Sequence, residues 1–440
     1  MIDTARTHFP GDLILGNPDS PIALCVHWTP KELYANLSDV VCVVGSLYSR
    51  EAGVARMIVN VLANPQIKVI ILTGQEHPDE RMRSANDLIA KTFTEAELGI
   101  PQKYIAEFHR RVWCMDMRAV SHKDEKMIRQ NIELAEDYAY SEHIPAPIYI
   151  ELPMPTVEVY PTSPSGTLIR GKDIADVHTK ILREIRTFGT SFTDDQGHVR
   201  QSLWQIMSVL DAEAQDYNSV PFATAKEVYR YGHELYYGTE DMEVKYQYGR
   251  LMTQKFGLDQ IEEAEKILRK TPDSTRPVIS LWDAATGMNA KDGPCMVLVH
   301  PTIRDGALHL CAYFRTQDMY LGYPRNAAGL IDLLQRMAVS LNVDIGTVTI
   351  VSANAHFYDH NFKDVDDHLR KTRPHTIDFD AKGNWSFSRT PSDYIAHLYS
   401  EGKEILQLRR NTKKQLLRDV ALHISDISHA LFIGGEIEKL

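Results

Sequence analysis

Short apolar runs alternate with a helical pattern between residues 21 and 74. The runs are IALCVH from Ile22, VCVVG from Val41 and KVIILTG from Lys68, and the helical pattern is GVARMIVNVLAN from Gly53. Continuous apolar runs rich in β-branched residues are typical of strands that are buried on both faces, as in parallel sheets covered by helices. The pattern therefore predicts a Rossmann-like α/β module at the start of the chain.

A change of pattern follows this module. A charged amphipathic helix is predicted from Lys123 to Tyr140, and the stretch up to Gly166 then carries six prolines, at 145, 147, 153, 155, 161 and 164. Proline fixes φ and removes a backbone donor, so this stretch predicts an extended linker. We place the module at residues 1–145 and the linker at 146–166.

Beyond the linker, strands and helices follow in an α+β order. Residues Leu308 to Phe314 alternate as a half-buried strand, Asn326 to Leu341 have helical spacing, and Val348 to Val351 read as another strand. The expected fold class is therefore α/β plus α+β.

Composition narrows the class of protein. The 440 residues exceed what one core usually serves, and 43% hydrophobic with 24% charged residues is typical of a globular chain. A formal charge of −11 argues against nucleic-acid binding. No apolar run approaches the about 20 residues that cross a membrane, so no membrane partner is expected. The cysteines are odd in number and lack metal-binding spacing, which predicts a cytoplasmic protein without a metal; they are Cys25, Cys42, Cys114, Cys295 and Cys311.

One cysteine lies in a chemically suggestive setting. Cys295 follows Asp292-Gly293-Pro294, and the run RTQDMYLGYPRN extends from Arg315 to Asn326. A reduced cysteine on one strand, with an arginine and an acid on a neighbouring strand and an amide at the head of the next helix, would form an anion-binding pocket around a nucleophile.

These residues resemble the thymidylate synthase family. The resemblance extends upstream to PDSTR at residues 272–276 with Trp282, and downstream to NAHFY at 354–358, and it covers roughly residues 167–362. It implies a catalytic domain at residues 167–375. It also implies C5 methylation of a uracil nucleotide, dUMP to dTMP, with 5,10-methylene-tetrahydrofolate or an archaeal methanopterin analogue. The family further implies a homodimer with shared active sites.

The resemblance assigns the catalytic roles. Cys295 is the nucleophile that adds to C6 of the ring, and Arg315 activates the sulfur and contacts the phosphate. Tyr248 matches the tyrosine associated with removal of the C5 proton. Glu234 is the candidate catalytic glutamate, and Gln205, which could act as neither acid nor base, is the rival alignment.

The nucleotide phosphate has further candidate ligands. Arg186 resembles the arginine of the phosphate loop, with an exposed salt bridge as the alternative. Arg276 matches an arginine that the family lends across the dimer interface, and Thr275 stands where its companion arginine would be. Thr316 supplies a hydroxyl where the family has serine.

Four residues are expected to contact the base, the sugar and the pterin. Asn326 would hydrogen-bond O4 and N3 of uracil, although an asparagine that opens a helix is first of all a good N-cap. His356 and Tyr358 alternate along a strand end, so both can face a sugar hydroxyl. Asp318 matches the acid that contacts the pterin ring.

Departures from the family leave two alternatives open. The segment before Tyr248 is short and lacks a shielding tryptophan, and the closing tail is missing, because Phe379 to Phe387 leads instead into a helical extension. Water could then replace hydride, as in a pyrimidine nucleotide 5-hydroxymethylase. The second alternative is a non-catalytic nucleotide- or pterin-binding regulator. The retained Cys295, Arg315 and Tyr248 argue against it, because binding alone needs no nucleophile.

The N-terminal module carries a second resemblance. Residues 16–25 and 60–74 resemble the A subunit of tetrahydromethanopterin methyltransferase, in which a histidine of the following helix would ligate cobalt. The comparable stretch here, DLIAKTFTEAELGI from Asp87, contains no histidine, so cobalamin is not expected. Residues 428–436 resemble a tail found with such modules. We therefore expect the extension at 376–440 to pack on the N-terminal module.

Overall fold

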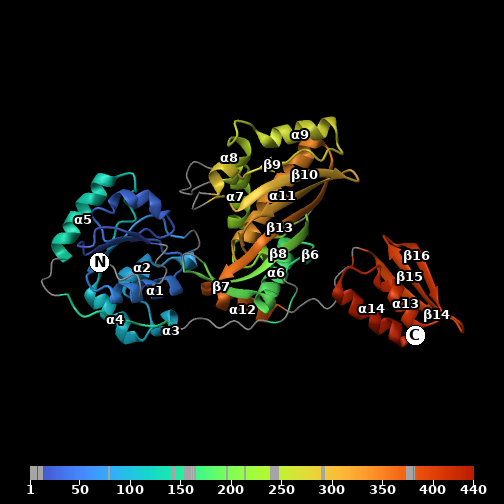
Figure 1. The fold of residues 1–440 in the computed structure, drawn as a ribbon, viewed down its shortest axis with the longest axis horizontal. Helices are drawn as coiled ribbons and strands as arrows, with labels where there is room; N and C mark the ends of the chain where they lie inside the picture. Colours follow the sequence, from blue (N-terminus) through green and yellow to red (C-terminus); the bar gives the residue numbers. More distant parts are fainter. Residues whose placement is uncertain are drawn as a thin grey trace. The chain divides into compact units, whose positions relative to one another are not determined.

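The computed structural model describes residues 7, 13–77, 80–139, 144–152, 160, 162, 165–194, 197–212, 215–237, 247–288, 293–372, 380 and 382–440. The chain divides into two compact units, residues 1–369 and residues 370–440. Figure 1 shows the fold, with the strands of the first unit in two sheets. We call residues 13–152 the N-terminal module and residues 167–369 the central domain.

The sheet of the N-terminal module has five strands in the order β1-β3-β2-β4-β5. Strands β2, β3, β4 and β5 pair in parallel, and β1 pairs antiparallel with β3 at the edge. The strands are β1 Leu13–Leu15, β2 Ile22–Cys25, β3 Val43–Gly45, β4 Val69–Leu72 and β5 Trp113–Asp116. The predicted buried parallel sheet is confirmed.

Helices cover both faces of this sheet because its strand residues alternate between two cores. Ala23 and Cys25 pack with α1 and α4, whereas Ile22 and Leu24 pack with α5 on the other face. Burial on both faces explains the continuous apolar runs. The helical segments are η3 Lys31–Leu37, α1 Glu51–Ala63, η4 Glu80–Met82, α2 Ala85–Ala90, α3 Glu95–Leu98, α4 Gln102–Arg111 and α5 Glu125–Ala139.

The start of the predicted linker lies against the N-terminal module. The N–H of Ile148 donates to the carbonyl oxygen of Leu62 at 2.8 Å, and Ile148, Ile150 and Leu152 pack on the core of the module. Much of the remaining linker, including Pro153 and Pro155, lies outside the described residues. The domain boundaries therefore stay predictions.

The central domain is built on an eight-stranded mixed sheet. Its order is β6-β8-β13-β11-β10-β9, with β7 paired to β8 and β12 paired to β13. The strands are β6 Thr167–Gly171, β7 Thr190–Thr193, β8 Val199–Asp211, β9 Ile279–Ser280, β10 Met296–Arg304, β11 Ala307–Phe314, β12 Gln317–Asp318 and β13 Asp344–Tyr358. Strand β13 extends the predicted segment 348–351 in both directions and reaches Tyr358.

Helices and loops of the central domain bury the inward face of this sheet in one large core, which includes Ile206, Ile350 and Ala312. Helix α11 begins at Gly322, four residues before the predicted start, because Pro324 in its first turn needs no N–H partner. Asn326 is thus an interior helix residue. The helical segments are α6 Ile174–Phe188, η5 Tyr217–Ser219, α7 Ala225–Tyr237, α8 Tyr248–Thr253, α9 Gln260–Lys270, α10 Ala284–Gly287, α11 Gly322–Leu341, η6 Asp359–Asn361 and α12 Phe362–Lys371.

The second unit has its own antiparallel sheet and core. Strands β14 Asn384–Arg389, β15 Tyr394–Ser400 and β16 Lys403–Arg410 precede helices α13 Lys413–Ala421 and α14 Ile427–Lys439. The extension was expected to be helical; it contains two helices but also three strands, which bury Trp385 and Leu398 against α13 and α14. Packing of this extension on the N-terminal module stays a prediction.

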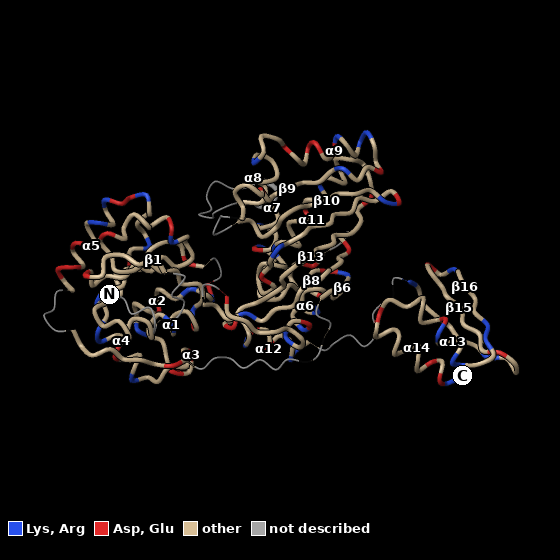
Figure 2. The backbone as a smooth tube through the Cα atoms, in the orientation of Figure 1, with Lys and Arg blue, Asp and Glu red and all other residues tan. Residues whose placement is uncertain are grey.

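Charged residues follow the same division between core and surface. Figure 2 shows Lys, Arg, Asp and Glu interspersed along outer helices such as α5 and α9, whereas the sheet strands carry few of them. Among the described residues, no helix combines the length and the apolar character needed to cross a membrane.

A buried histidine links α6 to the segment that precedes α11. The Nε2–H of His178 donates to the carbonyl oxygen of Met319 at 2.6 Å, and its ring stacks on Tyr323 at 5.9 Å. Burial lowers the pKa of His178 to about 4. The ring is therefore neutral at pH 7, and its contact holds the backbone beside Asp318.

This burial predicts a pH-dependent stability. The unfolded imidazole binds a proton below about pH 6.5 but the folded one only near 4, so its contribution is present above pH 6.5 and is lost as the pH falls through this window. The free energy of unfolding, measured with urea at several pH values, should fall less steeply with decreasing pH in His178→Gln than in the parent. The difference in slope should be up to about 1.4 kcal/mol per pH unit. Identical slopes for the variant and the parent would contradict the assignment.

Candidate functional site

The Cys295 loop is held by Arg315. Cys295 directly precedes β10 and Arg315 directly follows β11, and because these strands are antiparallel the two residues meet. The Arg315 N–H donates to the Cys295 carbonyl oxygen at 3.0 Å. Its guanidinium donates from Nε to the Pro294 carbonyl at 3.1 Å and from Nη2 to the Gly293 carbonyl at 2.7 Å. The arginine thus fixes the backbone that carries the sulfur.

Trp282 lies against the same loop. The Arg315 guanidinium lies 5.6 Å from the Trp282 ring centre. A Cβ on Gly293 would come within 3.0 Å of that ring, which explains the glycine at this close approach. The loop is therefore clamped between an arginine and a tryptophan that lie apart in the sequence.

Cys295 differs in its surroundings from the other cysteines. It is partly exposed, whereas Cys25, Cys42 and Cys114 are buried and burial raises their thiol pKa to about 12. Burial also raises the pKa of Cys311. Since the thiolate is the nucleophile, these four thiols are poor candidates for covalent catalysis.

Four predicted ligands gather beside this loop where β12 pairs with β13. Asp318 is the register partner of His356, and Thr316 Oγ1 lies 3.4 Å from His356 Nδ1. The rings of His356 and Tyr358 meet edge to face at 5.4 Å. The side chain of Tyr358 also interacts electrostatically with Asp318 and Cys295. The structure thus brings together Cys295, Arg315, Thr316, Asp318, His356 and Tyr358.

Burial keeps His356 and Tyr358 uncharged. It lowers the pKa of His356 to about 4, with a smaller effect from the positive charge of Arg200. Burial also raises the pKa of Tyr358 well above its usual range. Two neutral groups that can donate and accept hydrogen bonds suit a neutral ligand group such as a sugar hydroxyl.

Asp318 and Asn326 are fixed by hydrogen bonds to α11 and α7. The Asp318 carboxylate accepts from the backbone N–H groups of Tyr320, Leu321 and Gly322, at 3.0, 3.1 and 3.0 Å, and so closes the start of α11. Asn326 is buried, and its Oδ1 accepts from the Tyr231 hydroxyl at 3.0 Å. Among the described residues, Nδ2 of this amide has no hydrogen-bond acceptor and can therefore donate to a ligand.

Arg186 forms an ion pair, which was the alternative to its expected role in phosphate binding. Its guanidinium makes two hydrogen bonds to the Asp366 carboxylate, at 2.7 and 3.0 Å, and stacks over Phe362. A phosphate would have to compete with this carboxylate. Its phosphate-binding role stays a prediction.

The remaining predicted residues lie in different elements. Tyr248 is buried at the start of α8, with its ring 6.4 Å from that of Phe314 at the end of β11. Arg276 is exposed in the loop before β9. Gln205 is an exposed residue of β8 with φ 52°. Glu234 belongs to α7, but its side chain lies outside the described residues.

Sequence reasoning missed a charged group beside Tyr358. Arg200 is the register partner of Tyr358, its guanidinium lies 4.9 Å from the Tyr358 ring centre, and it forms an ion pair with Asp194. His198 lies 5.8 Å from the same ring. The Arg200 Nε is buried without a hydrogen-bond partner among the described residues. His198 and Arg200 are two residues apart where β8 begins, so they can face the same side of the strand. This spacing is the sequence signal that could have indicated these charged and aromatic neighbours of Tyr358.

The comparisons with known proteins indicate an enzyme of the one-carbon transferase class. The thymidylate synthase family model matches residues 180–406. The chain belongs to the thymidylate synthase family. The recognition made from the Cys295 and Arg315 segments is confirmed.

Individual relatives match the same part of the chain. The protein "Putative thymidylate synthase" of Methanosarcina barkeri is 31% identical over 201 residues, which are 45% of this chain and 92% of the relative. Its namesake in Methanosarcina acetivorans is 33% identical with the same coverage. The solved thymidylate synthase of T4 phage matches at 19% identity, with a TM-score of 0.39, over 49% of this chain and 85% of that chain. That last likeness is too low to carry an argument.

Proposed function

We propose that this protein methylates C5 of a uracil nucleotide, dUMP to dTMP, and uses a methylene-tetrahydropterin as the one-carbon and hydride donor. Either 5,10-methylene-tetrahydrofolate or a methanopterin analogue would serve. The observation that carries the proposal is the partly exposed Cys295, held by Arg315 beside Asp318 and Tyr358. A reactive thiol of this kind requires a reducing compartment such as the cytoplasm.

The chain's own groups support each step. The Cys295 thiolate adds to C6 of the ring and makes C5 nucleophilic enough to attack the methylene carbon of the pterin. Tyr248 then assists removal of the C5 proton, and Glu234 is the candidate that orients water. As the C5 proton leaves, the bond between the methylene carbon and the pterin nitrogen breaks, which leaves an exocyclic methylene on the ring. Hydride from the tetrahydropterin then adds to this methylene as the Cys295 sulfur leaves C6, which gives dTMP, the dihydropterin and the restored thiolate.

Ground-state binding would come from neutral and cationic groups around this sulfur. The exposed Arg315 is suited to the phosphate, together with the Thr316 hydroxyl, and the exposed Arg276 of a second copy would add a further cation. His356 and Tyr358 would hold the sugar. The Nδ2 group of Asn326 could donate to O4 of uracil, whereas cytosine carries a donor amino group at that position.

Hydroxymethylation of the same carbon is the second candidate reaction. Residues 228 to 248 contain no tryptophan that could shield the exocyclic methylene from water. Water in place of hydride would give 5-hydroxymethyl-dUMP and a tetrahydropterin. The two products differ in mass by one oxygen.

Loss of the nucleophile should abolish the chemistry. Thiolate addition at C6 labilises the C5 hydrogen, so tritium release from 5-tritiated dUMP with methylene-tetrahydrofolate should fall at least about a thousandfold in Cys295→Ser. Cys311→Ser is the matched control and should react like the parent. Mass spectrometry of products from dUMP, UMP, dCMP and CMP then identifies the base, the sugar and the added group. Equal tritium release from Cys295→Ser and the parent would rule out the mechanism.

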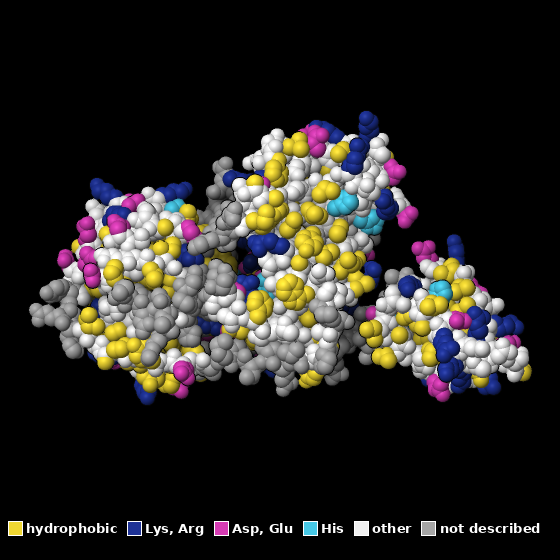
Figure 3. Space-filling view, in the orientation of Figure 1, with side chains coloured by type: hydrophobic (Ala, Val, Ile, Leu, Met, Phe, Trp, Pro, Cys, Tyr) yellow, Lys and Arg dark blue, Asp and Glu magenta, His cyan; other side chains and the backbone are white. Residues whose placement is uncertain are grey.

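An apolar row on the outer face of the central sheet supports a homodimer. Leu168, Met207, Val351, Tyr313 and Leu298 are successive register partners across β6, β8, β13, β11 and β10. Leu168, Met207 and Tyr313 are 48%, 42% and 37% exposed. Figure 3 shows hydrophobic side chains gathered over this region. Contiguous exposed apolar patches usually mark interaction surfaces. A second copy bound to this face would form the dimer in which Arg276 is expected to be shared.

A charge in this row should dissociate the dimer. Met207→Asp places a carboxylate at the centre of the proposed interface, where desolvating it is costly. Sedimentation equilibrium should show a dimeric parent and a monomeric variant with reduced activity. Met127→Asp, at a 45% exposed methionine of α5, is the control and should remain dimeric. A monomeric parent that retains full activity would contradict shared sites.

A further inference from the structure

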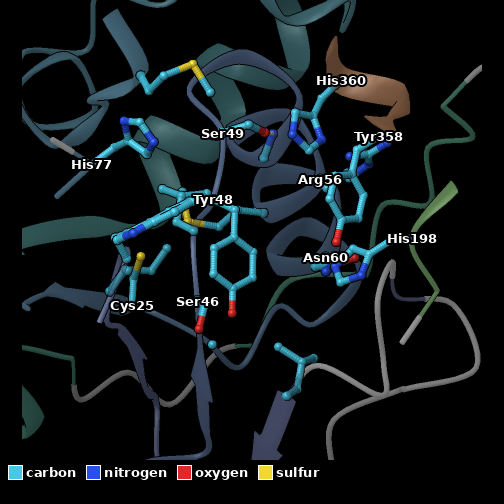
Figure 4. A pocket seen from close by; sticks show the side chains of 18 of the residues that line it. Cys25, Ser46, Tyr48, Ser49, Arg56, Asn60, His77, His198, Tyr358 and His360 are labelled. Carbon is cyan, nitrogen blue, oxygen red and sulfur yellow. Dashed lines mark hydrogen bonds between the residues drawn. The ribbon is translucent and has the colours of Figure 1, made fainter. Parts of the chain in front are cut away.

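A cavity of about 520 Å³ lies between the N-terminal module and the central domain within the first unit. Trp28, Tyr48 and Ser46 line it from the module, and Asp318, Gly322 and Tyr358 line it from the central domain. Figure 4 shows Tyr48 and Ser46 of the module facing the same space as His198 and Tyr358 of the central domain. Residues assigned to the catalytic site and residues of the module thus share one space.

Direct contacts hold the two walls together. Arg56 of α1 forms an ion pair with Asp359, the residue that follows Tyr358, and both side chains are largely buried. Arg81 donates to the carbonyl oxygen of Phe222 at 3.3 Å. Breaking a buried ion pair leaves an uncompensated charge, so the Arg56 contact constrains the module where it meets the site.

Aromatic rings run without interruption from one wall to the other. Successive ring centres are 4.5 Å apart from His77 to Trp28, 5.5 Å from Trp28 to Tyr48, 6.5 Å from Tyr48 to His198 and 5.8 Å from His198 to Tyr358. Trp28 and Tyr48 remain 41% and 37% exposed. Such flat, partly uncovered rings suit a planar ligand of similar character.

Two polar groups in this cavity retain unused hydrogen-bonding capacity. The Ser46 Oγ is buried without a hydrogen-bond partner among the described residues. The Asp318 carboxylate accepts three backbone N–H groups, and a carboxylate offers about four lone-pair positions. A ligand with polar groups could use this capacity, whereas a purely apolar ligand would leave it unused.

We propose that the N-terminal module forms the second wall of the pterin site. The bicyclic ring of the one-carbon donor would lie between Asp318 with Gly322 on one side and Trp28 with Tyr48 on the other. This inference rests on the proposed function, because it concerns the donor of that reaction. In this arrangement the module would exclude water from the reacting groups.

The test measures pterin binding by the full-length chain. Calorimetric titration of 5,10-methylene-tetrahydrofolate and of its methanopterin analogue into Cys295→Ser with dUMP avoids turnover. Trp28→Ala and Tyr48→Ala should each weaken pterin binding about tenfold or more, the scale expected for losing an aromatic contact. Binding of dUMP alone should stay within about twofold of the parent. Ser46→Ala, which removes no hydrogen bond to the described part of the chain, should weaken pterin binding severalfold without affecting folding.

Trp113→Ala is the matched control, because Trp113 is another module tryptophan, 40% exposed, outside the cavity. It should bind both pterins like the parent. Unchanged pterin affinity in the Trp28, Tyr48 and Ser46 variants, or no binding of either pterin by the parent, overturns the inference. The two proposals separate cleanly. Product formation with unaffected module variants rejects only the wall, whereas impaired pterin binding without any nucleotide product rejects only the reaction.

Discussion

The hydrogen bonds from Arg315 to the loop before Cys295 are the constraint on which the site depends. Antiparallel pairing of β10 and β11 brings the two residues together, and the guanidinium then binds the carbonyls of Gly293 and Pro294. An arginine can make such forked contacts and still present positive charge to an oxyanion, which a lysine cannot match. The same side chain thus fixes the loop that carries the proposed nucleophile, and it could supply the charge that a nucleotide phosphate would need.

The N-terminal module extends this arrangement. The Arg56–Asp359 ion pair joins α1 to the residue that follows Tyr358, so the module directly contacts the end of the strand that carries His356 and Tyr358. A one-carbon donor has to be shielded from water while its methylene group is attacked. In the proposed arrangement a second domain packed against the site provides that shielding, a role for the N-terminal module that would need no corrinoid.

Local patterns predicted the parts of the fold that depend on local burial. The strands at 22–25 and 69–72 were correctly expected, because burial on both faces leaves a continuous apolar run. The start of α11 was misplaced, because Gly322 and Pro324 suggest a turn although both are tolerated in a first helical turn. Within the site, the segments carrying Cys295 and Arg315 were sufficient to identify the family.

Contacts between distant segments could not be predicted in this way. Asp366 pairs with Arg186 across 180 residues, and the Asp194–Arg200 pair acquires its relevance only because β8 lies beside β13. The cavity likewise depends on residues of two domains meeting. Sequence spacing carries no information on such pairings unless a family pattern already includes them.

Covalent trapping of Cys295 tests the central claim most directly. In 5-fluoro-dUMP the fluorine at C5 cannot leave as a proton does, so a nucleotide that has added the thiolate and the methylene donor stays bound. Peptide mapping by mass spectrometry after incubation with this nucleotide and 5,10-methylene-tetrahydrofolate should find both groups on the peptide that contains Cys295. An adduct on another cysteine, or turnover of dUMP without any adduct, would contradict the account.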